Sequence, residues 1–83
     1  MPIRACVHII TNPGTARELA IALSKIDGVT STDLTTGRFD IMVLVEKKDA
    51  DLTWLQNTVL ANIRRQQGVV RTETAICTEK FTP

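Results

Sequence analysis

Two kinds of hydrophobic spacing alternate along the chain. From Ile3 to Ile10 apolar residues occupy every second position, which is the period of a strand with one buried face. From Ala16 to Lys25 they recur every three or four residues, which is the period of an amphipathic helix. The same two patterns return in the second half. The pattern predicts a strand, helix, strand, strand, helix and strand over Ile3 to Ile10, Ala16 to Lys25, Val29 to Leu34, Ile41 to Val45, Ala50 to Gln66 and Val69 to Thr78.

The third predicted strand, Ile41 to Val45, is an unbroken apolar run, unlike the other strands. A short run rich in β-branched residues is typical of a strand that is buried on both faces. The threonine-rich segment Val29 to Leu34 has the composition of a sheet edge. A tight turn joins the two segments, and Gly37 within it can adopt a positive φ.

A weak internal repeat links the two halves of the chain. The sequence K-I-D-G-V-T-S-T ends at Thr32, and R-Q-Q-G-V-V-R-T ends at Thr72, about 40 residues later. Two β-α-β halves in one domain predict the α+β, ferredoxin-like βαββαβ fold. Right-handed crossovers then place both helices on one face of a four-stranded antiparallel sheet. The two most apolar strands, the first and the third, are expected at the centre.

The predicted sheet has apolar residues on both faces. Ile41, Val43 and Val45 point to one side, whereas Met42 and Leu44 point to the other. Burying one such side chain contributes about 1.5–3 kcal/mol, and an exposed apolar patch usually marks an association surface. We therefore expect two sheets to pack face to face in a symmetric dimer.

Composition excludes several classes of function. The 83 residues carry a net charge of +1, one histidine and two cysteines. This charge predicts no basic surface for binding nucleic acid. The histidine and the cysteines are scattered and cannot form a zinc site, so we expect neither a metal nor a cofactor. No apolar run is long enough to span a bilayer, and the sequence predicts a single cytoplasmic domain. Cys6 and Cys77 lie in apolar segments and are expected to be buried free thiols.

Local patterns predict how the helices begin and pack. Thr15 and Glu18 have the spacing of a capping box, and Asp49 or Asp51 can cap the second helix. Trp54 lies off the core-facing stripe, so it either contacts a neighbouring subunit or lies across the helix edge. The stripe itself consists of residues at helical spacing: Leu52, Leu55, Val59 and Ile63.

Several short motifs occur in the order found in one known family. The turn T-G-R-F-D ends at Asp40 and leads into the apolar strand, while Gly68-Val69 opens the last strand and R-T-E-T follows from Arg71 to Thr74. A P-G turn follows the first strand. From Ile3 to Thr78 the chain resembles the effector-binding domain of Lrp/AsnC transcriptional regulators, which is called the RAM domain.

The resemblance implies a fold, an assembly and a ligand. RAM domains are ferredoxin-like, dimerise through their sheets, assemble into octamers or other closed rings, and bind free amino acids between dimers. An aspartate can pair with the α-ammonium group, and hydroxyl and backbone N–H groups can hold the carboxylate. The ligand-binding residues that it implies border this pocket from the turn and, facing the pocket across the sheet, from the last strand: Gly37, Arg38, Phe39, Asp40, Thr72 and Thr74.

Two features of this sequence depart from the family pattern. Arg38 replaces a small or acidic residue, and it either faces solvent or shifts the preference toward acidic or polar ligands. The chain also starts at the first strand, without the DNA-binding helix-turn-helix domain of full-length regulators. We therefore expect a stand-alone amino-acid sensor that does not bind DNA directly and that can co-assemble with full-length regulators.

Two other interpretations remain open at this stage. Gly37 and Asp40 can simply stabilise a hairpin, without binding any ligand. Alternatively, small dimeric α+β barrel enzymes, oxygenases and isomerases among them, share the predicted fold. Such an enzyme needs a positioned acid–base group, and His8 and Asp40 are the only candidates. Sequence spacing places no carboxylate beside His8, which favours a packed or edge histidine.

Overall fold

The order of elements matches the prediction, and the boundaries differ by a few residues. The computed structural model describes residues 2–83. The second predicted helix is one helical segment with three parts, of which the middle part is π-helical. The elements are β1 (Ile3–Thr11), α1 (Ala16–Leu23), β2 (Val29–Leu34), β3 (Ile41–Lys47), α2 (Leu52–Trp54), the π-helical η1 (Leu55–Leu60), α3 (Ala61–Arg65) and β4 (Val69–Ile76).

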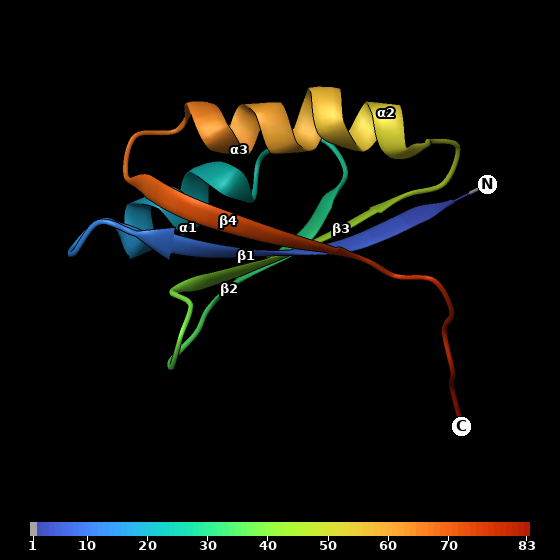
Figure 1. Cartoon of the computed structure of the whole chain (residues 1–83), viewed down its shortest axis with the longest axis horizontal. Coiled ribbons are helices and arrows are strands. Elements are labelled where there is room, and N and C mark those ends of the chain that lie inside the picture. Colours follow the sequence, from blue (N-terminus) through green and yellow to red (C-terminus); the bar gives the residue numbers. More distant parts are fainter. Residues whose placement is uncertain (1) are drawn as a thin grey trace.

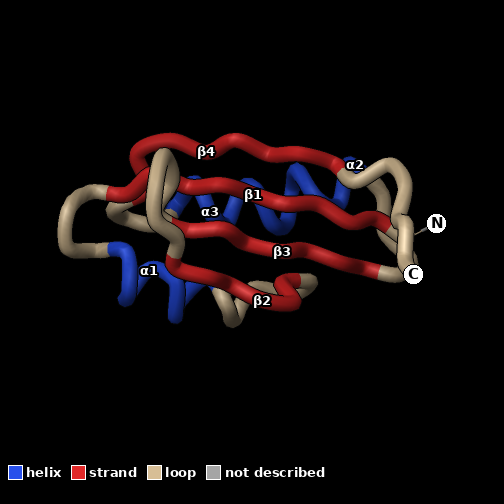
Figure 2. The backbone as a smooth tube through the Cα atoms, turned by 90° about the horizontal axis from the view of Figure 1, so that it is seen from below, coloured by secondary structure: helices blue, strands red, loops and turns tan. Residues whose placement is uncertain are grey.

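The four strands form one antiparallel sheet in the order β2-β3-β1-β4. Within residues 2–83 all helices lie on one face of this sheet, and no helix covers the other face (Figures 1 and 2). This arrangement confirms the predicted ferredoxin-like α+β class and the central position of β1 and β3. The turn between β2 and β3 and the C-terminal segment both extend to the side away from the helices (Figure 1).

The hydrophobic core lies between the helices and the covered face of the sheet. Strands β1 and β3 contribute every second residue, as their alternation predicts, and the helices contribute the remainder. No strand residue in this core exposes more than 8% of its surface. The core consists of Ile3, Ala5, Val7, Ile9, Leu19, Ala20, Leu23, Ile41, Val43, Val45, Leu55, Val59, Leu60 and Ile63.

The π-helical segment changes which residues of the second helix enter the core. Leu52, predicted to be buried, is 49% exposed, whereas Leu60, which the stripe omitted, is 7% exposed. The Ala61 N–H donates to the Gln56 carbonyl, five residues earlier. Because this i→i+5 pattern widens the turn, Leu55 and Leu60 share the buried side. A stripe calculated for a regular α-helix was therefore wrong at these two positions.

Only one of the two predicted helix caps forms. Asp51 accepts a hydrogen bond from the Trp54 N–H at 3.0 Å, which confirms the cap of the second helix. Thr15 occupies the N-cap of α1 but makes no capping bond with its side chain. Its hydroxyl donates to the Asn12 carbonyl at 2.8 Å. The predicted capping box is therefore wrong, because a turn bond uses the hydroxyl.

Trp54 packs within its own subunit. Its ring lies against Gly28, where any Cβ atom would overlap it, and Gly28 has a φ of +90°. The Lys47 Nζ atom lies 5.8 Å from the centre of the ring. Of the two predicted alternatives, the structure supports the one in which Trp54 lies across the helix edge.

Candidate functional site

The sheet face opposite the helices is here called the open face. It carries alternate residues of all four strands, because directly paired residues point to the same side. On this face Leu44 is 37% exposed, and Met42 and Ile10 are half-buried. In the single chain β3 is therefore buried on one face only. The open face consists of Arg4, Cys6, His8, Ile10, Ser31, Asp33, Met42, Leu44, Glu46, Arg71, Glu73 and Ala75.

The turn from Thr35 to Asp40 is closed by its own hydrogen bonds. The Thr35 N–H donates to the Asp40 carbonyl at 2.9 Å, and the Thr35 hydroxyl donates to the Phe39 carbonyl at 2.8 Å. Gly37 has a φ of +98°, as the sequence predicts for this turn. The turn is thus a formed structure before any ligand binds.

Asp40 ties this turn to the end of β1. Its Oδ2 atom accepts a hydrogen bond from the Thr11 N–H at 2.8 Å and a longer one from the Thr11 hydroxyl at 3.4 Å. The Asp40 N–H donates to the Ile9 carbonyl at 2.9 Å. The carboxylate is therefore half-buried and fixed in place, with both side-chain bonds made by the same oxygen.

Arg38 and Phe39 extend over the open face. The Phe39 and His8 rings lie 4.9 Å apart, and the Arg38 guanidinium lies 5.4 Å from the centre of the Phe39 ring. Arg38 also pairs with Glu73 of β4 at 3.5 Å, although its side chain is 71% exposed. The structure therefore places Arg38 mostly in solvent, in contact with a neighbouring strand.

Thr72 and Thr74 lie on the other face of the sheet. They pair with Ile9 and Val7, both of which point toward the helices. The structure thus brings Gly37, Arg38, Phe39 and Asp40 together in one turn but does not bring the two threonines to it. Within one subunit the register of β4 turns these two side chains to the face opposite Phe39. Their place beside a ligand between dimers stays a prediction.

The two cysteines differ in their surroundings. Cys6 is half-buried on the open face, and its Sγ lies 3.8 Å from the His8 Nε2 atom. Burial, together with the nearby Cys77, raises the pKa of the Cys6 thiol. Cys77 is exposed, as are the last three residues of β4 before it, so the prediction of two buried thiols was wrong for Cys77.

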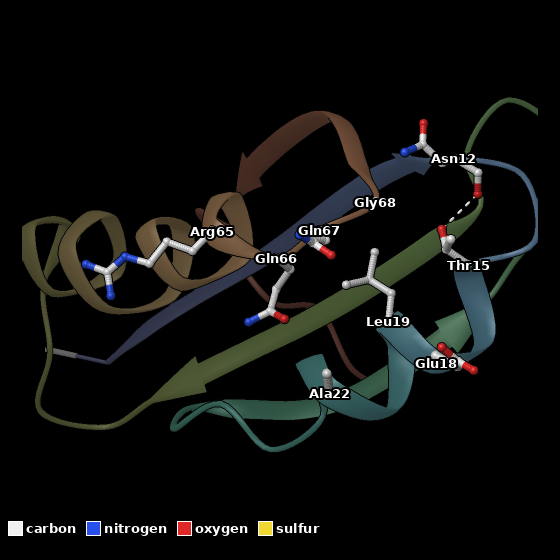
Figure 3. A pocket seen from close by; sticks show the side chains of 9 residues that line it. All are labelled: Asn12, Thr15, Glu18, Leu19, Ala22, Arg65, Gln66, Gln67 and Gly68. Atoms are coloured by element: carbon white, nitrogen blue, oxygen red, sulfur yellow. Dashed lines mark hydrogen bonds between the residues drawn. The ribbon is translucent and has the colours of Figure 1, made fainter.

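A groove that sequence reasoning missed opens on the helix side of the molecule (Figure 3). It has a volume of about 610 Å³ and lies between α1 and the end of α3. Leu19, Gln66 and Gln67 extend into its middle in Figure 3. None of the six predicted ligand-binding residues lines it. The groove is lined by Asn12, Thr15, Glu18, Leu19, Ala22, Arg65, Gln66, Gln67 and Gly68.

Neither a cluster of metal-binding side chains nor a membrane-spanning helix occurs within residues 2–83. No group of three or more histidine, cysteine, aspartate or glutamate side chains is placed to hold a metal ion in this part of the chain. No helix formed by these residues has the length and apolar character required to cross a membrane.

Known structures resemble the whole chain. TTHA0845 from Thermus thermophilus has 27% sequence identity and a TM-score of 0.86, covering 98% of this chain and 99% of its own. AsnC of E. coli has 23% identity and a TM-score of 0.83, and the match covers 94% of this chain and 52% of AsnC. The regulator NMB0573 of Neisseria meningitidis, in complex with L-Met, has 19% identity and a TM-score of 0.83. The match covers 98% of this chain and 53% of NMB0573.

These comparisons differ in what they establish. At their low identity, AsnC and NMB0573 show the fold alone, and this chain matches about half the length of each. No curated protein matches the chain. The family model of the Lrp/AsnC ligand binding domain, however, matches residues 4–83. The chain therefore belongs to the Lrp/AsnC ligand-binding domain family, a family of regulatory domains.

Proposed function

We propose that this domain binds a free amino acid between subunits and responds through its assembly. The family supports a ligand-binding role, and the L-Met complex of NMB0573 supports the class of ligand. One observation about this chain carries the proposal: the expected ligand residues lie on two opposite faces of the sheet. A single small molecule can contact both groups only if they come from different subunits.

Asp40 has the properties required to bind an α-ammonium group. Its Oδ2 atom is held by Thr11, which leaves the Oδ1 atom for a ligand. A charge-assisted hydrogen bond between an ammonium group and a carboxylate is about twice as strong as a neutral one. The backbone N–H groups around Gly37 and the hydroxyls of Thr72 and Thr74 are the proposed partners of the carboxylate. Arg38, extended into solvent, offers a further charge to an acidic or polar side chain.

The open face is the proposed dimer interface. Two sheets that pack face to face lie about 10 Å apart, and each covers the apolar residues of the other. In this arrangement Met42 and Leu44 would leave water, and the turns that carry Asp40 would lie at the outer border of the dimer. Further contacts between such dimers would build an octamer or another closed ring with crevices for the ligand.

We further propose that the domain affects transcription through full-length relatives in the cytoplasm. A regulator such as AsnC aligns with this chain over 52% of its length, so the two can present comparable assembly surfaces. With a net charge of +1, this domain has no electrostatic means of binding DNA by itself. Mixed assemblies would let it alter DNA binding indirectly, in response to an amino acid.

The same structure gives no support to the enzyme alternative. His8 lies against Cys6 and Phe39, while Asp40 is bonded to Thr11. The two candidate acid–base groups therefore have separate partners. We propose that the domain has no catalytic role.

A thermal-shift screen with the twenty amino acids tests the ligand proposal. At a hundred times its Kd, a ligand stabilises its protein by about 2.7 kcal/mol, so at least one amino acid should raise the Tm by several degrees. The Asp40→Asn variant keeps an acceptor for Thr11 but loses the charge, and it should lose the shift while the assembly persists. If no amino acid shifts the Tm, the ligand proposal fails. A loss of assembly in Asp40→Asn would favour the hairpin role of Asp40.

A further inference from the structure

The side chains of Cys6 and His8 converge on the open face. The two residues are two positions apart on β1, so their Cα atoms lie roughly 7 Å from each other and both side chains point away from the helices. Their ends are much closer, since the Cys6 Sγ atom lies 3.8 Å from the Nε2 atom of His8 and 4.0 Å from its Nδ1 atom. Within residues 2–83 the His8 ring has no other hydrogen-bond partner. One sulfur and one imidazole nitrogen are thus presented to the same point.

This separation is close to the one that a tetrahedral metal ion imposes on two of its ligands. Zinc lies about 2.3 Å from a cysteine sulfur and about 2.0–2.1 Å from a histidine nitrogen. At the tetrahedral angle these lengths place the sulfur and the nitrogen about 3.6 Å apart. The observed distance of 3.8 Å therefore needs only a small adjustment of the side chains. A single chain has too few ligands for zinc, as its composition predicts, but it supplies half of a set of two cysteines and two histidines.

The pair lies near the centre of the open face. Strand β1 runs from Ile3 to Thr11, so Val7 is its middle residue, and β1 is one of the two inner strands (Figure 2). A twofold axis that relates two sheets packed face to face lies in the plane between them, about 5 Å from each sheet. When the axis passes close to Val7, Cys6 and His8 of one copy face the same two residues of the other, whether it runs along the strands or across them.

The surroundings of the pair favour a site without net charge. Leu44 and Met42 of β3 are the direct neighbours of Cys6 and His8 in the sheet, so each proposed ligand has an apolar side chain beside it. An uncompensated charge between two packed sheets is costly. Two thiolates and two neutral imidazoles around Zn²⁺ give a neutral site, and this ligand set is one that tetrahedral zinc favours. A second sheet can therefore cover the site without a counter-ion.

We propose that two copies of this chain bind one Zn²⁺ ion at the centre of the face-to-face dimer, through Cys6 and His8 of each copy. This inference rests on the sheet-face contact proposed above. One copy does not complete the site, because residues 2–83 place no third metal-binding side chain beside the pair. Each Cys6 thiol releases its proton to solvent when the metal binds, so a rising pH favours binding. The metal stabilises the dimer and leaves the crevices at its border to the amino acid.

Zinc titration of the metal-free wild-type protein tests this site. One zinc ion should bind per two chains and should raise the Tm by several degrees. With zinc at a hundred times its Kd for the dimer, mass action lowers the apparent Kd of dimerisation about a hundredfold, which sedimentation velocity measures. Co²⁺ in place of zinc should give the strong d–d absorption of a tetrahedral ion and a thiolate-to-cobalt charge-transfer band.

Three variants separate this site from the rest of the molecule. Cys6→Ser and His8→Gln each remove one ligand from both copies. Removing a mere hydrogen-bond partner of a metal ligand already costs about 10–100-fold in affinity, so each variant should raise the zinc Kd by at least about a hundredfold. Cys77→Ser is the matched control, since Cys77 is the only other cysteine and is exposed beyond the end of β4. This variant should bind zinc as the wild type does.

The possible outcomes distinguish the metal site from the dimer on which it rests. A dimer that binds no zinc would overturn the metal site and leave the sheet-face contact standing, whereas a chain that stays monomeric with and without zinc would overturn both. One zinc ion per chain, or a loss of binding in Cys77→Ser, would contradict the ligand set. A cobalt spectrum of the wild type without a thiolate band would do so even if a variant failed to fold. Amino-acid shifts of the Tm, measured on metal-free protein, test the ligand proposal separately.

Discussion

The two faces of the sheet share the same strands but differ in composition. On the helix side, Ile9, Ile41 and Val43 have no exposed surface. One residue away along β3, Met42 is half-buried and Leu44 is 37% exposed, and the edge strands carry the charged residues Asp33, Arg71 and Glu73 on this face. The covered face completes the fold of the subunit. The open face leaves apolar area exposed, and such area usually marks an association surface.

The largest expected effect concerns the covered face. Ile41→Ala removes a side chain that is fully buried between β3 and the helices. It should lower the free energy of unfolding by about 2–5 kcal/mol, as truncations of buried isoleucine do. Urea denaturation followed by circular dichroism measures the loss. A decrease below about 1 kcal/mol would show that the core is not organised around β3.

The next effect concerns the open face. Leu44→Asp should leave the subunit folded and abolish the face-to-face dimer, because it places a charge in the proposed interface. Sedimentation velocity measures the assembly, and circular dichroism measures the folding of the subunit. Leu34→Asp is the matched control, since Leu34 is 53% exposed on β2 but pairs with Ile41 and points to the helix side. An equal loss of assembly in both variants would contradict the distinction between the faces.

Two glycines provide an intermediate comparison. Gly28 and Gly37 have similar φ values, +90° and +98°, so alanine is strained at both. That strain costs about 1–3 kcal/mol. At Gly28 the new methyl group would also overlap the Trp54 ring, whereas at Gly37 nothing lies within 4 Å. Gly28→Ala should therefore lower the Tm more than Gly37→Ala, and the reverse order in differential scanning calorimetry would disprove the packing of Trp54.

The smallest effect concerns thiol reactivity. The pKa of Cys6 is raised by burial and by Cys77, so less of it is thiolate at a given pH. Cys77 is exposed and should react first with a disulfide reagent, while the reaction of Cys6 should accelerate only at higher pH. Because the folded pKa is raised, the associated stability is present at neutral pH and is lost as the pH rises through that pKa. Mass spectrometry of labelled Cys77→Ser and Cys6→Ser variants separates the two rates.

Sequence alone predicted the features that depend on local periodicity. The two-residue period of a strand correctly divided Ile41 to Val45 into two sets on opposite faces, and Gly37 marked the turn by its positive φ. The ferredoxin-like order followed because two β-α-β halves allow few topologies. These features depend on residues close together in the sequence.

Features that depend on competition between partners were not predictable in the same way. The capping hydroxyl of Thr15 bonds to Asn12 instead, and the π-helical turn brings Leu60 into the core. Thr72 and Thr74 face the helices because the pairing of β4 with β1 fixes their side, and no local pattern reveals that register. Asp40 was correctly placed in the turn, but its bond to Thr11 spans 29 residues.

Small-angle X-ray scattering of the wild-type protein tests the central claim, that a second copy covers the open face. A lone subunit has a mass of 9.2 kDa and a Cα radius of gyration of 12.5 Å. The account predicts a particle of at least twice that mass, with a clearly larger radius of gyration, at micromolar concentration. A profile that fits a single subunit at every concentration, with Leu44 in water, would contradict it.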